Sequence, residues 1–166
     1  MRNQKPLDTY EKVKEKALRL LEFRSHSEFE LTQKLRHQGA KDEYIEDTLD
    51  FCRRYGFVND KAYAQRKAAD LINLKKYGLR RVKSELKAKG ISKIIIDEVK
   101  LEFDTDEECD VLIGLVEKKL RGDFSDKSKE RCIRYFVYRG YDIYDIRNAM
   151  NIVIEKCKTS NFKESI

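Results

Sequence analysis

Cationic side chains crowd into one short segment of the chain. Between positions 75 and 89, seven basic residues accompany a single acid, Glu85. The basic residues are Lys75, Lys76, Arg80, Arg81, Lys83, Lys87 and Lys89. Since these like charges cannot neutralise one another, they gain most from nearby phosphate or carboxylate groups. The segment therefore predicts a binding site for a polyanion or an acidic partner.

The spacing within this segment places three of the cations on one face of a helix. Over residues 79–89, Arg80, Lys83 and Lys87 recur at i, i+3 and i+7, while Val82 falls on the apolar face. A solvated helix usually mixes charges of both signs, because opposite charges at i and i+4 stabilise it. A face with cations alone favours ligand binding over the simpler alternative, an ordinary solvated surface.

A second basic segment also carries tyrosines. Arg131, Tyr135 and Tyr138 share one helix face, and Arg134 lies between them in the sequence. Bases can stack on tyrosine rings while arginines contact the sugar-phosphate backbone. Core packing explains tyrosines equally well. We take Arg131, Arg134 and Tyr138 as further candidate residues for binding a partner or nucleic acid.

No catalytic or metal-binding motif accompanies these segments. The chain has no glycine-rich phosphate loop, no Gly-x-Ser-x-Gly turn and no His-Glu-x-x-His pair. Its cysteines are Cys52, Cys109, Cys132 and Cys157. No two of them form a Cys-x-x-Cys pair, and neither His26 nor His37 lies within five residues of a cysteine. We expect a protein that is not an enzyme, holds no metal or cofactor, and buries its cysteines as reduced thiols.

The elements that position these residues are predicted to be helices throughout. The only proline in the 166 residues is Pro6, so the rest can form helices without an obligatory break. Charged residues make up 40% of the chain and the net charge is +6. The longest apolar run, 111–116, is far short of the ~20 residues a membrane span needs, and the N-terminus lacks a signal-peptide core. We expect an all-α cytoplasmic protein.

Three glycines mark an internal repeat. Gly39, Gly90 and Gly140 are separated by 51 and 50 residues. Four positions before each stand Leu35, Leu86 and Phe136, and six positions after each stand Ile45, Ile96 and Ile146. Because glycine adopts the left-handed conformation that ends many helices, each copy is predicted to contain a helix, a glycine cap and a second helix. A further amphipathic helix precedes each pair.

The repeat predicts three tandem three-helix units. They cover 10–58, 60–103 and 107–156, with a flexible N-terminus at 1–9 and a C-terminal tail at 157–166. Units of about fifty residues are close to the lower limit for an independent core, so neighbours are expected to share apolar surface in an elongated, curved array. We expect a monomer.

Two helix starts and one stability difference follow from this assignment. Ser27 and Glu30 form the pattern of a capping box, and the Asn59-Asp60 pair precedes the first helix of the second unit. We expect Gly39→Val to destabilise the protein more than Gly122→Val does, because only the former is assigned to a helix cap.

Three blocks of residues carry a family resemblance. The first is Arg24-x-x-Ser27-x-x-Glu30-Leu31-x-x-x-Leu35. The second is Gly56-Phe57-Val58-Asn59-Asp60, followed by Tyr63-Ala64. The third is Gly78-x-Arg80-Arg81-Val82-x-x-x-Leu86-x-x-x-Gly90-Ile91. In order and spacing the blocks resemble the RecX family of regulatory proteins, over residues 14–156. Leu79 departs from the pattern, since many members have proline there.

The resemblance implies a function in homologous recombination, DNA repair and the SOS response. RecX proteins are modulators of the RecA recombinase that lie along the groove of the RecA filament on single-stranded DNA and restrain its ATPase and strand exchange. The DNA could be contacted directly or through the filament. Reversing Arg80, Arg81, Lys83 and Lys87 to Glu is expected to weaken binding at nearly unchanged melting temperature, with Lys12, Lys14, Lys118 and Lys119 as the control set.

Two other function classes stay open. One is a sequence-specific DNA-binding regulator, because a helix, glycine turn and helix superficially resembles helix-turn-helix. The predicted third helices, 42–53 and 93–103, speak against it because their exposed sides are acidic or apolar. The other is a helical scaffold that binds only protein.

Overall fold

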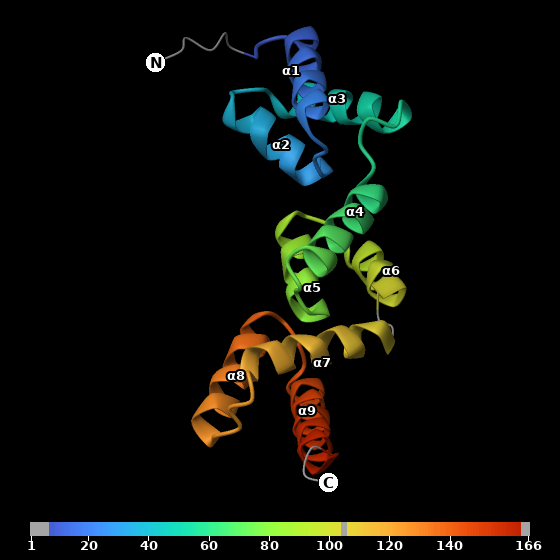
Figure 1. Cartoon of the computed structure of the whole chain (residues 1–166). Coiled ribbons are helices and arrows are strands. Elements are labelled where there is room, and N and C mark those ends of the chain that lie inside the picture. Colours follow the sequence, from blue (N-terminus) through green and yellow to red (C-terminus); the bar gives the residue numbers. More distant parts are fainter. Residues whose placement is uncertain (1–6, 104–105, 164–166) are drawn as a thin grey trace. The chain divides into compact units, whose positions relative to one another are not determined.

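Nine helices make up most of the described residues, 7–103 and 106–163, of this computed structural model, and these residues contain no strand (Figure 1). The helices are α1 (Tyr10–Phe23), α2 (Glu28–His37), α3 (Asp42–Arg54), α4 (Asp60–Asn73), α5 (Leu79–Ala88), α6 (Lys93–Phe103), α7 (Asp106–Leu120), α8 (Asp126–Tyr138) and α9 (Ile143–Lys163). The all-α prediction is confirmed. No helix in the described part of the chain is both long and apolar enough to span a bilayer.

The three repeat glycines adopt the predicted conformation. Gly39, Gly90 and Gly140 have φ angles of +82°, +74° and +94°, each two residues past the end of a helix. At all three turns the chain therefore reverses through a left-handed residue. Gly122 also has a positive φ, +80°, in the turn after α7. The expected contrast between Gly39 and Gly122 is therefore wrong, because both positions disfavour a β-branched residue.

The chain divides into two compact units. Unit 1 comprises the described residues up to Ala68 together with Glu85–Asp97, and unit 2 comprises Ala69–Ser84 and the described residues from Glu98 onward. The division passes through α4, α5 and α6, so each of these three helices contributes residues to both units. The contacts described below are therefore given for each unit separately.

The core of unit 1 is built mainly by α1, α2 and α3. Val13, Leu31 and Leu35 have no exposed surface, and Leu7 packs against the same core with 8% exposed. Leu7 belongs to the segment predicted as flexible, which is therefore ordered from residue 7, while 1–6 lie outside the described residues. Helices α1, α2 and α3 lie together around this core (Figure 1).

The core of unit 2 is built mainly by α7, α8 and α9. Phe136 lies at its centre with 2% exposed, packed edge-on against the ring of Tyr141 at 5.7 Å between centroids. Val116 and Ile146 are fully buried in the same cluster. Helix α9 continues to Lys163, into the segment predicted as a C-terminal tail.

The cysteines occupy different environments. Cys52 and Cys132 are buried in the two cores, as predicted, and burial raises the pKa of both thiols. Cys109 is exposed and Cys157 is half-buried. The expectation that all four are buried is therefore wrong for Cys109 and is met only in part by Cys157.

Candidate functional site

Within unit 2, the turn before α5 is hydrogen-bonded to the turn after α8. The backbone N–H of Gly78 donates to the carbonyl of Arg139 at 3.0 Å, and that of Arg80 donates to the carbonyl of Gly140 at 3.2 Å. A Cβ at Gly78 would lie 2.6 Å from the backbone of Gly140, and a Cβ at Gly140 would lie 2.3 Å from the backbone nitrogen of Arg81. Two glycines are therefore needed for this close approach.

Side chains from the end of α8 complete the same junction. The Arg139 guanidinium donates to the carbonyl oxygens of Lys75 and Lys76, and the Tyr141 hydroxyl donates to the Lys76 carbonyl at 3.2 Å. These bonds satisfy backbone acceptors in a turn where Lys76 has a φ of +52°. The basic turn 75–76 is thereby held beside α8.

A cation–tyrosine cluster forms at this junction, composed of Tyr77, Arg81, Tyr135, Tyr138 and Arg139. The Arg81 guanidinium lies 5.6 Å from the ring centroids of both Tyr77 and Tyr138. The Arg139 guanidinium lies 5.1 Å from the ring of Tyr77 and 5.2 Å from that of Tyr135. All of these distances are in the range of cation–π attraction. The structure thus brings together two predicted site residues, Arg81 and Tyr138, that are far apart in the sequence.

Tyr77 and Arg139 were not among the predicted site residues. The sequence did carry a signal for each, because Tyr77 directly follows the basic pair at 75–76 and Arg139 directly precedes a repeat glycine. Their position in the cluster depends on the junction between two segments about sixty residues apart, which no local pattern specifies.

The predicted cationic face of α5 is not formed by cations alone. Arg80, Lys83 and Lys87 are all exposed, as expected, but Arg80 forms an ion pair with Asp142. The prediction that this face presents cations alone is therefore wrong at Arg80. Asp142 was missed because it is distant in sequence and reaches Arg80 only through the junction with α8.

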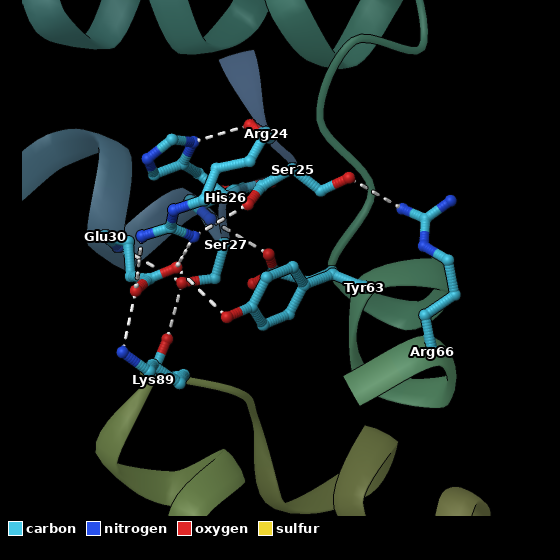
Figure 2. A network of polar contacts seen from close by, with 10 residues as sticks. Arg24, Ser25, His26, Ser27, Glu30, Tyr63, Arg66 and Lys89 are labelled. Carbon is cyan, nitrogen blue, oxygen red and sulfur yellow. Dashed lines mark hydrogen bonds and ion pairs between the residues drawn. The ribbon is translucent and has the colours of Figure 1, made fainter. Parts of the chain in front are cut away.

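Lys89, another predicted site residue, belongs to a polar network within unit 1 (Figure 2). Its ammonium donates to the Glu30 carboxylate at 2.7 Å, which also accepts from the Tyr63 hydroxyl at 3.0 Å and from Arg24 at 3.4 Å. The Glu30 side chain is only 11% exposed. Lys89 is thus engaged in holding α2 to the turn after α5.

The network determines the charge state of Glu30. Burial alone raises the pKa of this carboxyl, but hydrogen bonds from Lys89, Arg24 and Tyr63 outweigh burial and lower the pKa to about 2. Burial, followed by the Glu30 carboxylate, raises the pKa of Tyr63 to about 12. The pair therefore remains carboxylate and neutral phenol at physiological pH.

The start of α2 is capped from two sides. Ser27 Oγ accepts from the Glu30 N–H at 3.1 Å, as predicted, and donates to the Lys89 carbonyl at 2.7 Å. The Asp60 carboxylate accepts from the Glu28 N–H at 2.9 Å. The carboxylate of Glu30 points instead into the network of Figure 2, so the predicted capping box is only half formed. Asn59 caps α4 by accepting from the Ala62 N–H at 2.9 Å.

The predicted arginines of α8 separate into two environments. Arg134 forms an exposed ion pair with Glu130 at 3.6 Å. Arg131 lines a surface pocket together with Lys118 and Lys119. The Lys119 ammonium also lies 4.0 Å from the ring centroid of Tyr135. Lys118 and Lys119, proposed from the sequence as control positions, therefore belong to the same surface as the cluster and cannot serve as controls.

The described part of the chain contains no group of three His, Cys, Asp or Glu side chains arranged to hold a metal ion. Unit 2 instead presents a surface of exposed cations and tyrosines, in which Tyr138 is 76% exposed. Such a surface is suited to anionic partners, because it offers charge and flat apolar faces together.

Comparison with known protein families matches residues 14–52 to the first three-helix domain of RecX and residues 59–99 to its second three-helix domain. Regulatory protein RecX of Clostridioides difficile is 33% identical over 160 residues, covering 95% of this chain and 72% of that protein. Regulatory protein RecX of Vibrio campbellii is 33% identical over 140 residues, covering 83% and 89%.

Solved structures show the same fold. The crystal structure of RecX from Lactobacillus salivarius superposes with a TM-score of 0.78 at 21% identity, covering 87% of this chain and 96% of that one. A second crystal structure of a regulatory protein RecX gives a TM-score of 0.74 at 21% identity, covering 84% and 71%. The helical architecture predicted from the sequence is thus one already observed in crystals.

Proposed function

Because the chain belongs to the RecX family of regulatory proteins, we propose that it binds the RecA filament on single-stranded DNA and inhibits its ATPase and strand exchange. The observation that supports this proposal is the cation–tyrosine cluster of unit 2. It combines the basic segment at 75–83 with the tyrosines of α8 in one surface.

The chemistry of the cluster fits an anionic partner. Arg81 and Arg139 carry permanent charge and lie against tyrosine rings, which limits their conformational freedom before binding. The exposed ring of Tyr138 offers a flat face to a partner side chain or base. The protein acts by occupying a surface on its partner and carries out no chemical step of its own.

The proposal is tested by adding the protein to RecA filaments on single-stranded DNA and measuring ATP hydrolysis. Wild-type protein should slow ATP turnover in proportion to its occupancy of the filament. Tyr138→Ala should raise the half-inhibitory concentration about ten-fold, the effect of removing an interaction worth about 1.4 kcal/mol.

Tyr144→Ala is the matched control, because its ring is equally exposed at 76%. It should change the half-inhibitory concentration less than about two-fold, as expected for an exposed side chain outside the binding surface. If the wild-type protein leaves ATP turnover unchanged, the proposed function is wrong. If both variants lose inhibition equally, the cation–tyrosine cluster is not the surface that binds the filament.

A further inference from the structure

Two adjoining pockets open on the surface of α7 and α8 in unit 2. One, of about 380 Å³, is lined by Lys118, Lys119, Arg121 and Arg131 among others. The other, of about 220 Å³, is lined by Lys76, Tyr135 and Arg139, and again by Lys118 and Lys119. Lys118 and Lys119 of α7 line both pockets, and we therefore call the two pockets the paired pockets.

The lining of the paired pockets is strongly cationic. It contains six basic side chains and one acid, Asp123. The basic residues are Lys76, Lys118, Lys119, Arg121, Arg131 and Arg139. The carboxylate of Asp123 accepts from the backbone N–H of Ser125 at 3.0 Å, and this bond, with further bonds from serines and the nearby charge of Arg131, lowers its pKa. One carboxylate engaged in a turn leaves most of the positive charge uncompensated.

Two other basic residues of α8 form ion pairs with carboxylates. Lys129 pairs with Asp126 at 3.5 Å, and Arg134 pairs with Glu130 at 3.6 Å. By contrast, within the described residues Lys118, Lys119 and Arg121 form no ion pair with a carboxylate. These three lining cations are therefore available to an anion from outside the chain.

Backbone conformation sets two of the lining residues apart. Among the described residues, only Lys76 and Arg121 have a positive φ without being glycine, each at +52°. Lys76 lines one pocket and Arg121 lines the other. Lys76 lies in the turn after α4 and Arg121 directly follows α7, so both positions belong to turns that end a helix.

Tyr135 holds the cations of the smaller pocket in place. Its hydroxyl accepts from the Arg139 guanidinium at 3.1 Å, and its ring lies 4.0 Å from the Lys119 ammonium. Cations positioned in this way lose less conformational entropy when an anion binds than free lysines would.

We propose that the paired pockets bind successive phosphates of a single-stranded nucleic acid directly, without the recombinase. The choice of nucleic acid over other phosphate-bearing ligands rests on the proposed function. Two adjoining cationic pockets suit a chain of phosphates, and the exposed Tyr138 ring at the end of α8 offers a face for a base.

The test measures binding of a fluorescent oligothymidylate to the purified protein. Lys118→Glu with Lys119→Glu should lower the affinity at least about ten-fold and should flatten the dependence on salt by about 0.7 in log-log slope for each phosphate that is no longer neutralised. Arg54→Glu with Lys93→Glu makes the same change in net charge on exposed residues of α3 and α6 that line neither pocket. This control should keep affinity within about two-fold.

A second variant separates binding from folding. Arg121→Gly removes a cation and relieves a strained φ, so the oligothymidylate affinity should fall while the melting temperature does not. Unchanged affinity in this variant, or equal losses in the two double variants, would overturn the proposal. Inorganic triphosphate should compete only weakly; competition as effective as that of unlabelled oligothymidylate would assign the pockets to a small polyphosphate instead.

The same proteins, added to recombinase filaments, distinguish this inference from the proposed function. A wild-type protein that slows ATP turnover but does not bind oligothymidylate would leave the function intact and exclude direct phosphate binding. A protein that binds oligothymidylate through Lys118 and Lys119 but leaves ATP turnover unchanged would support phosphate binding by the paired pockets. It would exclude the proposed inhibition of the recombinase.

Discussion

The ammonium of Lys89 lies 2.7 Å from the carboxylate of Glu30, and this ion pair joins the turn after α5 to α2. The repeat spacing aligns Glu30 with Arg81 and Lys89 with Arg139. The ion pair of one junction is therefore replaced in the other by two cations arranged around Tyr77. The backbone turns are alike, but the first junction places an ion pair at these two positions, whereas the second places two arginines that lie against tyrosine rings.

Removing the charge of Glu30 should destabilise the protein. Glu30→Gln leaves Lys89 and Arg24 without a carboxylate in a position only 11% exposed, at an expected cost of about 2 kcal/mol in the free energy of unfolding. Urea unfolding at neutral pH measures this difference. Glu15→Gln is the control, because its pair with Arg19 is 64% exposed and should contribute less than about 0.5 kcal/mol.

The contribution of Glu30 should depend on pH in a stated direction. Its pKa is lowered from 4.5 to about 2, so the folded state favours the carboxylate and the stabilisation is fully present above pH 4.5. It is lost as the pH falls from 4.5 towards 2. The stability difference between wild type and Glu30→Gln should therefore narrow over that window; a difference that stays constant would contradict the network.

Two repeat glycines should differ in their tolerance of alanine. A Cβ at Gly39 meets nothing within 4 Å, so Gly39→Ala should cost only the left-handed strain of about 1–2 kcal/mol. A Cβ at Gly140 would lie 2.3 Å from the backbone nitrogen of Arg81, which must move. Gly140→Ala should therefore lower the unfolding free energy by at least about 1 kcal/mol more than Gly39→Ala. If the two substitutions lower the unfolding free energy equally, the backbone around Arg81 moves away from the new Cβ at little cost.

The four-fold charge reversal on α5 should not be neutral in stability. Arg80→Glu would face Asp142, and Arg81→Glu would remove the interactions with Tyr77 and Tyr138. We expect Arg80→Glu with Arg81→Glu to lower the unfolding free energy by about 1–2 kcal/mol. Lys83→Glu with Lys87→Glu, on exposed positions, should change it by less than about 0.5 kcal/mol. Thermal or urea unfolding of both double variants measures these changes in unfolding free energy.

Thiol labelling should separate the cysteines by burial. Cys109 is exposed and should react first in the native protein, whereas Cys52 and Cys132 should react only on unfolding, since burial also raises their pKa. Cys109→Ser should abolish the fastest labelling phase and keep the slow one. Fast labelling of Cys132 in this variant would contradict the core of unit 2.

Local features determined what could be predicted from the sequence alone. The apolar periodicity specified the helices, and the glycines at 39, 90 and 140 specified the turns, because both depend on conformational preferences within a few residues. The order of short motifs was enough to indicate the family. The same reasoning identified a basic segment, since charge composition is a property of the sequence.

Tertiary structure decided what those charges do. Lys89 was predicted to bind a partner and instead holds Glu30, and Arg80 meets Asp142 from a different repeat. Lys118 and Lys119, chosen as controls, lie in the same pockets as Arg139. A charge acts through neighbours within a few ångströms, and in this protein those neighbours are supplied by segments about twenty to sixty residues away, which only tertiary packing brings together.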